Sequence, residues 1–600
     1  MTYAGNGEIT AEGITLSGVR KDEDCILTEL WRRPPRAEAE GASVKHAISQ
    51  AKGQRSNHFE AILVFLMDRV LRTIHHFLLG GEAMERFLEI IKTANDAVNS
   101  AVWGLPGLIL LIGTGILLTI GTKVFQVCHI GHWWKKTIAS IFQKNSNSTK
   151  KTDKKTISQF QALCAALAAT VGTGNIAGVA AAIVTGGPGA VFWMWVAAFF
   201  GMMTNFSENV LGIYYRRRNK EGEWSGGPMY YLKDGLGKRY GKKWLKPVAS
   251  VLAILFSCFA IFASFGIGNM AQINKIVINM DSAFFSNVSL GFIPGTQIDI
   301  IHLIIGLALL TVGALIIIGG LQRIARVAEI IVPFMAVVYC VGAVIILCIN
   351  INTVGAMFAA IFKFAFTPAA FLGGGLGVLI KKTMTQGFKR GVFSNEAGLG
   401  SSVMVHSSSN VKEPVKQGMW GIFEVFFDTF VVCTMTAIVV LSTGFIDLTT
   451  GAPIPGANGD TLVSEAFGRY FGAPGTWFVA IAMLFFAFTT VLGWSQYGSK
   501  AVEHLFGSKG VKVYKFIFVA MMVTGAVMEG GLAWDLSDTF NGLMMIPNLI
   551  GVLALFPLVI KITKNYIDRK INKKDVAPIL SYDPEIQAET EAALKNEDDQ

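Results

Sequence analysis

The feature that most constrains this chain is the recurrence of apolar runs about 20 residues long. Clear examples are Trp193–Tyr214, Ile298–Gly319 and Ile330–Ile349. A helix rises about 1.5 Å per residue, so a run of this length crosses the ~30 Å hydrocarbon core of a bilayer. Only 16% of the residues are charged, against about 25% in soluble proteins. The sequence therefore predicts an all-α polytopic membrane protein and argues against an array of soluble domains.

The apolar pattern predicts eleven membrane spans. They fall near residues 103–127, 160–184, 188–213, 245–268, 298–319, 323–349, 376–409, 416–442, 476–498, 512–529 and 536–560. Lysine and arginine collect in loops that this count places on one side, including residues 214–247, and basic loops mark the cytoplasmic face. We therefore expect a multi-pass protein of the cell membrane, of the bacterial inner or plasma membrane type, with a cytoplasmic C-terminus.

The two ends of the chain differ from the membrane core. Residues 1–80 read as a polar and amphipathic extension, because charged side chains interrupt the apolar stretch 61–79 and favour a surface helix over a span. Residues 81–127 hold an extra N-terminal transmembrane helix. The acidic segment 565–600 is expected to be a disordered cytoplasmic tail.

The remaining composition excludes several classes of function. The seven cysteines show neither CxxC pairs nor zinc-ligand spacing with histidine. The net charge of +10 comes from short basic loops, so it does not indicate nucleic-acid binding. The sequence contains neither a GxxxxGK[ST] phosphate-binding loop nor an HExxH motif. We expect no enzyme activity, no cofactor and no obligate protein partner.

The second span is interrupted by polar and flexible residues. It contains Gly172-Thr-Gly-Asn175 in the middle of Leu167–Val184. Close packing of helices through small residues is one interpretation. The other is an unwound segment, whose free N–H groups suit a carboxylate and whose carbonyls near Ala168–Val171 suit a hard cation such as Na+.

The seventh span carries a similar interruption. It reads GVFSNEAGLGSSVMVHSSS from Gly391 to Ser409, and Ser394, Asn395 and Gly398 are candidate substrate contacts. The two interrupted spans open two five-helix halves, 160–349 and 376–560, and an odd number of spans inverts the second half. Glycine-interrupted spans at matching positions are typical of secondary transporters with a site at the repeat interface. This pair favours transport over tolerated packing.

Other polar side chains in apolar surroundings are candidates to complete the sites. The hydroxyls of Thr489 and Thr490 can ligate Na+, or can bond a carbonyl one turn earlier. Asp428 is an intramembrane carboxylate with an expected cation-linked role. Asn269 and Gln272 can receive a substrate group, or can form interfacial hydrogen bonds.

Four further polar residues lie near these candidates. Glu424, one turn before Asp428, shares its role or pairs with a base. Arg390 and Glu396 flank the second interruption, and we expect a structural ion pair there. His406 is expected to be a packed side chain.

Several ordered blocks resemble one known family. GGPGAVFWMWVAAFFG, starting at Gly186, is similar to the signature of the alanine or glycine:cation symporters (sodium:alanine symporters), within the amino acid–polyamine–cation superfamily. GTGNIAGVAAAI, SGGPMYYL, GIGNMAQ, RGVFSNEAGLGS and DTFVVCTMTA resemble other blocks in the same order. The resemblance runs from about Ala97 to Thr563, so residues 1–80 fall outside it.

The resemblance implies a leucine-transporter-type fold, with two inverted five-helix repeats plus one extra N-terminal helix. It also implies symport of alanine or glycine into the cell with Na+. The resemblance implies that Na+ binds the carbonyls of Ala168 and Val171 and the hydroxyls of Thr489 and Thr490. It implies that the substrate carboxylate binds the amides of Thr173 and Gly174. A second cation site is implied near Thr170, Asn175 and Asp428. Many relatives of this fold use neutral ligands where Asp428 stands, so H+ coupling is the main alternative, ahead of a channel.

Overall fold

The computed structural model describes residues 81–143, 149, 156–239, 242–294, 296–367, 376–528 and 531–598. The chain divides into two compact units, Met1–Ile90 and Ile91–Gln600. The expected extension 1–80 lies outside the described residues. The elements discussed below belong to Ile91–Gln600, apart from the first residues of helix α3.

The described part of the chain is almost entirely helical, with one short antiparallel hairpin that pairs Arg217 with Ser225. In chain order, with η for 3₁₀- or π-helical segments, the elements are α3 (Gly81–Val102), α4 (Leu105–Gly121), α5 (Phe125–Cys128), α6 (Ile130–Lys136), α7 (Ile138–Ile141), α8 (Gln159–Thr170), η2 (Gly174–Gly178), α9 (Val179–Gly186), α10 (Gly189–Tyr214), β1 (Arg217–Arg218), β2 (Trp224–Ser225), α11 (Pro228–Tyr230), η3 (Tyr231–Leu236), α12 (Gly237–Arg239), α13 (Leu245–Phe265), η4 (Gly266–Met270), α14 (Ala271–Met280), η5 (Asp281–Phe285), α15 (Ile300–Ile317), α16 (Leu321–Ile349), η6 (Ile351–Thr353), α17 (Val354–Phe366), α18 (Leu376–Asn395), α19 (Val403–His406), α20 (Pro414–Val425), η8 (Phe426–Cys433), α21 (Thr434–Ser442), α22 (Leu462–Phe471), α23 (Ala473–Val527), α24 (Gly531–Ala554), α25 (Phe556–Tyr566), η9 (Ile567–Ile571) and α26 (Pro584–Asp598).

Helices cover most of each of the eleven predicted spans, but fewer helices are long and apolar enough to cross a membrane. Among the described residues, seven helices are long and apolar enough to cross a membrane, or up to nine if each bent pair counts as one span. The ninth and tenth predicted spans both lie in α23, as two helical stretches separated at Gly507, whose backbone is non-helical with φ +70°. The last predicted span bends by 60° between α24 and α25, at the turn that precedes Pro557.

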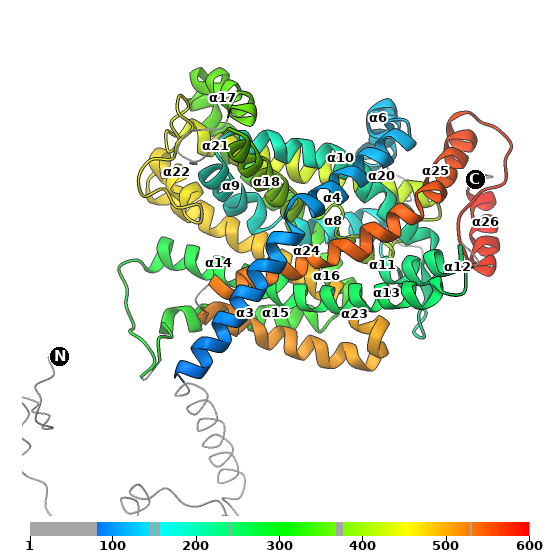
Figure 1. The fold of residues 1–600 in the computed structure, drawn as a ribbon, viewed down its shortest axis with the longest axis horizontal. Coiled ribbons are helices and arrows are strands. Elements are labelled where there is room, and N and C mark those ends of the chain that lie inside the picture. Colours follow the sequence, from blue (N-terminus) through cyan, green and yellow to red (C-terminus); the bar gives the residue numbers. More distant parts are fainter. Residues whose placement is uncertain are drawn as a thin grey trace, which may run out of the picture. The chain divides into compact units, whose positions relative to one another are not determined.

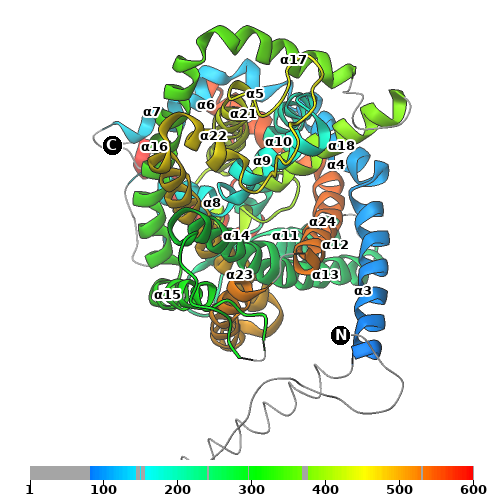
Figure 2. The ribbon, with the colours of Figure 1, turned by 90° about the vertical axis from the view of Figure 1, so that its left-hand side faces the viewer.

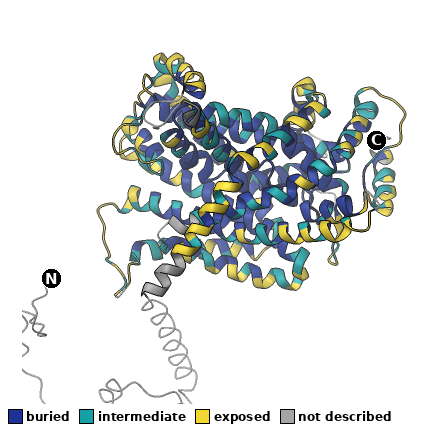
Figure 3. Ribbon diagram, viewed as in Figure 1, coloured by how far each residue is buried: buried dark blue, intermediate teal, exposed yellow. Residues whose placement is uncertain are grey.

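Burial separates inner from outer helices. About two thirds of the apolar window is buried in α10, in α20–α21 and in α23, but only 28% in α15 and 33% in α16. Large apolar side chains such as Leu315 and Phe334 are exposed on the outer pair. Figure 3 shows these exposed residues along the outer helices, with buried residues inside. Exposed apolar faces of this kind suit contact with lipid.

The first predicted break is present in the structure. A capping box closes the start of α8, where Ser158 Oγ accepts from the Gln161 amide and Gln161 Oε1 accepts from the Ser158 amide. The helix ends at Thr170, and the helix that resumes at Gly174 is bent by 54° from it. Residues 171–173 form the break.

The second predicted break is also present. Helix α18 ends at Asn395 and α19 begins at Val403, with non-helical backbone between them. Gly398 and Gly400 have φ of +95° and +73°, a region that glycine enters without strain. Glu396 has φ +56°, which is uncommon for a residue with a Cβ and costs about 1–3 kcal/mol.

The two broken helices lie among the most buried elements. Helix α10 packs along α18 and α20, while α8 contacts α16, α20 and α23. Figures 1 and 2 show α8 in the interior of the helical assembly. The breaks therefore lie inside the helical assembly, where irregular backbone can find hydrogen-bond partners.

The C-terminal segment differs from the disordered tail that we expected for residues 565–600. Residues 572–583 form neither helix nor strand and lead into α26. The Tyr582 amide donates to the Tyr214 carbonyl at 2.9 Å, and Leu580 is buried. The acidic composition predicted disorder, but the segment contacts the rest of the chain through the buried Leu580 and the bond from Tyr582 to Tyr214.

Arg569 and Glu413 form a bidentate ion pair, at 2.7 and 2.8 Å, that ties η9 to the start of α20. Both side chains are at least nine-tenths buried. Replacing Arg569 by glutamine leaves the Glu413 carboxylate without its charged partner. We expect a loss of about 2 kcal/mol of stability, measured as a lower apparent melting temperature of the purified protein. The exposed pair Arg218–Glu589 is the control, and Arg218→Gln should leave the melting temperature within error.

Candidate functional site

The carboxylate of Asp428 joins the two breaks. Asn175, just after the first break, donates to Asp428 Oδ1 at 2.7 Å. Ser394, just before the second break, donates to Asp428 Oδ2 at 2.8 Å. Thr429 adds a bond to Oδ2 at 2.9 Å, and Asp428 is fully buried. Asp428 lies in the π-helical segment η8, a distortion that is frequent at functional sites.

The backbones of the two breaks also approach each other closely. A Cβ on Gly174 would stand 3.4 Å from the Cα of Ser394 and 3.1 Å from the ring of Phe393. Asn395 is held by a bond to Thr429 Oγ1 at 3.0 Å and accepts from the Ala397 amide. The predicted residues Ser394 and Asn395 therefore meet the first break around one buried carboxylate.

The amide of Thr173 is occupied by a side chain in this structure. Gln272 Oε1 accepts from it at 3.3 Å, so the structure brings Gln272 to the first break. Asn269 is placed elsewhere, because its amide donates to the Phe518 carbonyl at 2.6 Å. The Gly398 carbonyl is also occupied, by Asn548 Nδ2 at 2.8 Å.

The residues predicted to form a sodium site lie between α8 and α23. A Cβ on Gly172 would stand 2.3 Å from Thr490 Oγ1, and a Cβ on Gly493 would stand 2.8 Å from the backbone of Ala169. Ala168 and Val171 are buried in the same contact, and the chain leaves α8 at Val171 with ψ 90°.

The hydroxyls of Thr489 and Thr490 donate to carbonyls about one turn earlier, which was the alternative to a role as Na+ ligands. Thr490 donates to the Phe486 carbonyl at 3.0 Å and Thr489 to that of Phe485 at 2.9 Å. Thr170 likewise donates to the Ala166 carbonyl at 3.3 Å. A hydroxyl that donates its proton in this way still offers its oxygen lone pairs to a cation.

A cavity of about 400 Å³ lies against the first break. Thr173 lines it, and Thr173 Oγ1 is buried without a hydrogen-bond partner. The lining residues carry charges of both signs, including Arg390 and Asp460. A buried hydroxyl without a partner, at a cavity wall, marks a place where a polar ligand can bind.

The expected Arg390–Glu396 ion pair is wrong. Arg390 lies over the ring of Phe393, at 5.7 Å from its centroid, whereas Glu396 accepts from Ser401. The left-handed backbone at Glu396 turns its side chain to Ser401 within the same break. Glu396 is therefore a buried carboxylate without a basic partner among the described residues.

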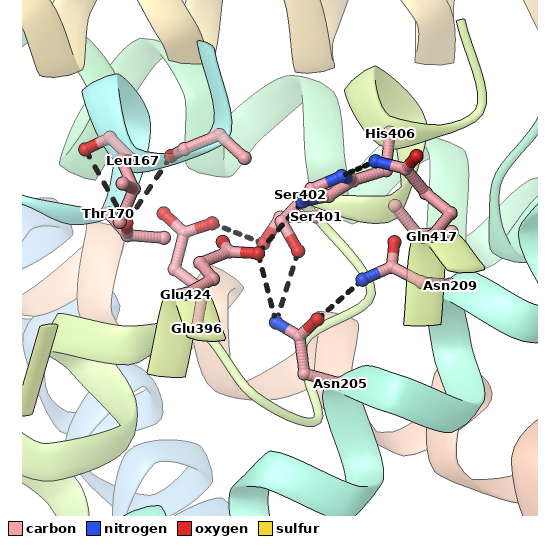
Figure 4. Close-up of polar contacts among 12 residues, drawn as sticks. Leu167, Thr170, Asn205, Asn209, Glu396, Ser401, Ser402, His406, Gln417 and Glu424 are labelled. Atoms are coloured by element: carbon pink, nitrogen blue, oxygen red, sulfur yellow. Dashed lines mark hydrogen bonds and ion pairs between the residues drawn. The ribbon is translucent and has the colours of Figure 1, made fainter. Parts of the chain in front are cut away.

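One buried polar group, around Glu208, was missed by the sequence reasoning, whereas Glu424 pairs with a base, His406, which is one of its two expected roles. Glu208 on α10 accepts from Asn548, which also accepts from Tyr231 and holds the Gly398 carbonyl of the second break. An acid inside an apolar span was the available signal. His406 is packed as expected, but it also bonds Glu424, and Figure 4 shows this group beside Glu396.

Comparison with known proteins identifies a family and several relatives. The sodium:alanine symporter family matches residues 88–579. The sodium/alanine symporter AgcS of Methanococcus maripaludis is 42% identical over 492 residues, which cover 81% of this chain and 99% of AgcS. An uncharacterized transporter of Haemophilus influenzae is 40% identical, over 81% of this chain and 98% of its own. GlnT of Bacillus subtilis, named a probable sodium/glutamine symporter, is 36% identical over 82% of this chain and 93% of its own.

Among solved structures, the crystal structure of MhsT in complex with L-phenylalanine matches with a TM-score of 0.45 and 12% identity, covering 69% of this chain and 99% of that one. A match at this level supports neither the repeat arrangement nor the site. The sequence relatives are transporters rather than enzymes, and the apolar helices make this a multi-pass membrane protein. On the extent of these matches, the chain belongs to the sodium:alanine symporter family.

Proposed function

We propose that this protein is a secondary active transporter that carries alanine, glycine or both into the cell together with Na+, by alternating access. The observation that carries the proposal is the bonding of Asn175 and Ser394, one from each break, to the buried carboxylate of Asp428. The name of the relative AgcS, a sodium/alanine symporter, supports the choice of ion and substrate. No cofactor is needed besides the coupling ion.

The proposed fold is of the leucine-transporter type. Residues 160–349 and 376–560 form two inverted five-helix repeats in this proposal, and residues 81–127 add the extra helix. The observed breaks support it, because each lies in the helix that opens a proposed repeat. The C-terminus is proposed to be cytoplasmic, on the side of the basic loops.

In this proposal the substrate carboxylate binds the amides of Thr173 and Gly174 at the cavity. Gln272 must release the Thr173 amide for this to happen, so we assign Gln272 to a switch between protein and substrate bonds. Asn269, Ser394, Asn395 and Gly398 stay candidate substrate contacts. The N-terminus of the helix that resumes at Gly174 adds favourable partial charge for an anion.

The coupling ion is proposed to bind between α8 and α23. Its ligands are the carbonyls of Ala168 and Val171 and the hydroxyls of Thr489 and Thr490. The close approach of Gly172 to Thr490 supports this position. Thr170, Asn175 and Asp428 form a possible second cation site.

The energy for accumulation comes from the sodium gradient. One Na+ moving down ~100 mV supplies about 2.3 kcal/mol, and a tenfold concentration gradient adds about 1.4 kcal/mol. Together these support roughly 500-fold accumulation of a zwitterion without ATP. Coupling requires that Na+ and substrate each raise the affinity for the other by the same factor.

Uptake of labelled alanine into proteoliposomes tests the proposal. Uptake should require external Na+, should fail when K+ or choline replaces it, and should be inhibited by glycine more than by leucine or glutamine. Uptake that ignores Na+ but follows the pH gradient would establish H+ coupling through Asp428. Flux that does not saturate with alanine concentration would favour a channel.

Thr490→Ala removes one proposed sodium ligand. We expect the Na+ concentration for half-maximal uptake to rise about fivefold, which corresponds to the loss of about 1 kcal/mol for one polar contact. Thr490→Ser keeps the hydroxyl and should stay near the wild-type value. A sodium dependence that is unchanged in the alanine variant, at equal expression, would remove Thr490 from the site.

A further inference from the structure

A second buried polar network lies beside the second break, around His406 of α19 and Glu424 of α20 (Figure 4). Ser409 Oγ donates to Gln417 Oε1 at 3.1 Å, which leaves Gln417 Nε2 to donate to His406 Nδ1 at 2.5 Å. A ring nitrogen that accepts a hydrogen bond carries no proton, so the network assigns the His406 proton to Nε2. Nε2 then donates to Glu424 Oε2 at 2.9 Å.

The two oxygens of Glu424 differ. Oε2 accepts from His406 and, at 3.5 Å, from Asn205 Nδ2. Oε1 is buried and has no hydrogen-bond partner. The side chains of His406 and Glu424 are both fully buried. An ionised carboxylate in such a place is costly unless a positive charge or a proton compensates it.

The groups that face Glu424 do not supply that positive charge. It interacts electrostatically with Glu208 on α10, Glu396 in the second break, Tyr497 on α23 and Asp428 on its own helix. Within the described residues, Glu424 forms its salt bridge with His406. No described lysine or arginine forms an ion pair with Glu424 or with the three neighbouring carboxylates, which are Glu208, Glu396 and Asp428. Histidine is a base that exchanges protons near neutral pH.

We propose that the Glu424–His406 pair is a proton-binding site, separate from Asp428, whose proton controls cation binding at Asp428. A proton taken from water onto Glu424 Oε1 removes the charge and leaves the bond from His406 on Oε2 intact. The pair therefore has two hydrogen-bonded forms that differ by one proton.

The effect on Asp428 has a definite sign. Glu424 precedes Asp428 by four residues, about one helical turn, and its charge acts on Asp428. Ionised Glu424 adds negative potential at Asp428 and strengthens cation binding there, whereas a proton on Glu424 weakens it. For a unit charge at this separation we expect about a tenfold difference in affinity. This inference uses the proposed function only to locate a cation site at Asp428.

Equilibrium binding of radiolabelled Na+ to the purified full-length protein, without amino acid, tests the proposal. The Na+ affinity of the wild type should rise about tenfold as the pH is raised through the range in which Glu424 loses its proton. Glu424→Gln should bind Na+ weakly at every pH, because it mimics the protonated form. Glu424→Asp keeps a titratable group and should keep the pH dependence. Glu465→Gln makes the same chemical change at an exposed position of α22 and should match the wild type.

Two results would overturn the proposal. One is a wild-type Na+ affinity that does not change with pH, which decides the matter even if a variant fails to fold. The other is a Glu424→Gln protein that keeps the wild-type pH dependence of Na+ affinity. That result would show that a group other than Glu424 binds the proton. Failure of the transport proposal has a different signature, because pH-dependent Na+ binding without alanine uptake would leave the proton site standing.

Discussion

Replacing Asp428 by asparagine is expected to reduce Na+-driven alanine uptake to background. The amide has nearly the shape of the carboxylate, so the contacts with Asn175 and Ser394 can be kept in part and the fold should survive. The negative charge between the two breaks is lost. Removing one partner of a buried charge interaction costs about 3 kcal/mol or more, which corresponds to at least about a 100-fold loss of Na+ affinity.

Two measurements complete this test. Radiolabelled Na+ binding should weaken in parallel with uptake, because the charge acts on the ion rather than on the amino acid. Asp447→Asn makes the same change in a loop, where Asp447 bonds Thr449 and Thr450 at an exposed site, and should transport normally. Asp428→Asn protein with sodium affinity within about threefold of wild type would show that the carboxylate holds the breaks together without binding the ion.

The spans and both breaks could be predicted because their signals are local. A run of twenty apolar residues predicts a span by itself, and Gly-Thr-Gly-Asn inside such a run predicts a break. Each signal is contained in one short, continuous stretch of the sequence. The same reasoning separated the ninth and tenth spans, and the non-helical backbone at Gly507 lies between them. It missed the ordered C-terminal segment, because composition does not show which basic loops lie nearby.

The site could be predicted only in part. Asp428 stands out as an acid in an apolar run, but its bond to Asn175 joins residues 253 positions apart, and only the folded chain reveals it. Asn269 and Gln272 lie three residues apart and looked equivalent. The fold turns one to Phe518 and the other to the amide of Thr173. Glu208 was missed because its partner, Asn548, lies 340 residues away.

The Gly493→Ala variant tests whether the contact between α8 and α23 is required for sodium binding. The added methyl group would stand 2.6–2.8 Å from the Cβ, Cα and backbone nitrogen of Ala169, so the two helices must move apart. Overpacking of this kind costs about 1–3 kcal/mol, and we expect the upper end because rigid backbone is in the way. The apparent melting temperature of the purified protein should fall clearly.

The same variant should also lose most of its sodium affinity. Thr490 precedes Gly493 by about one turn on α23 and lies against Gly172 at the end of α8, so separating the helices enlarges the proposed ion site. A cation held by fixed oxygens tolerates little displacement, and we expect at least a tenfold rise in the Na+ concentration for half-maximal uptake. Gly113→Ala is the matched control, since nothing lies within 4 Å of its added Cβ in α4. A Gly493→Ala protein with a lowered melting temperature but a normal sodium dependence would contradict this prediction. It would show that the contact between α8 and α23 stabilises the fold without binding the ion, and would favour the site next to Asp428.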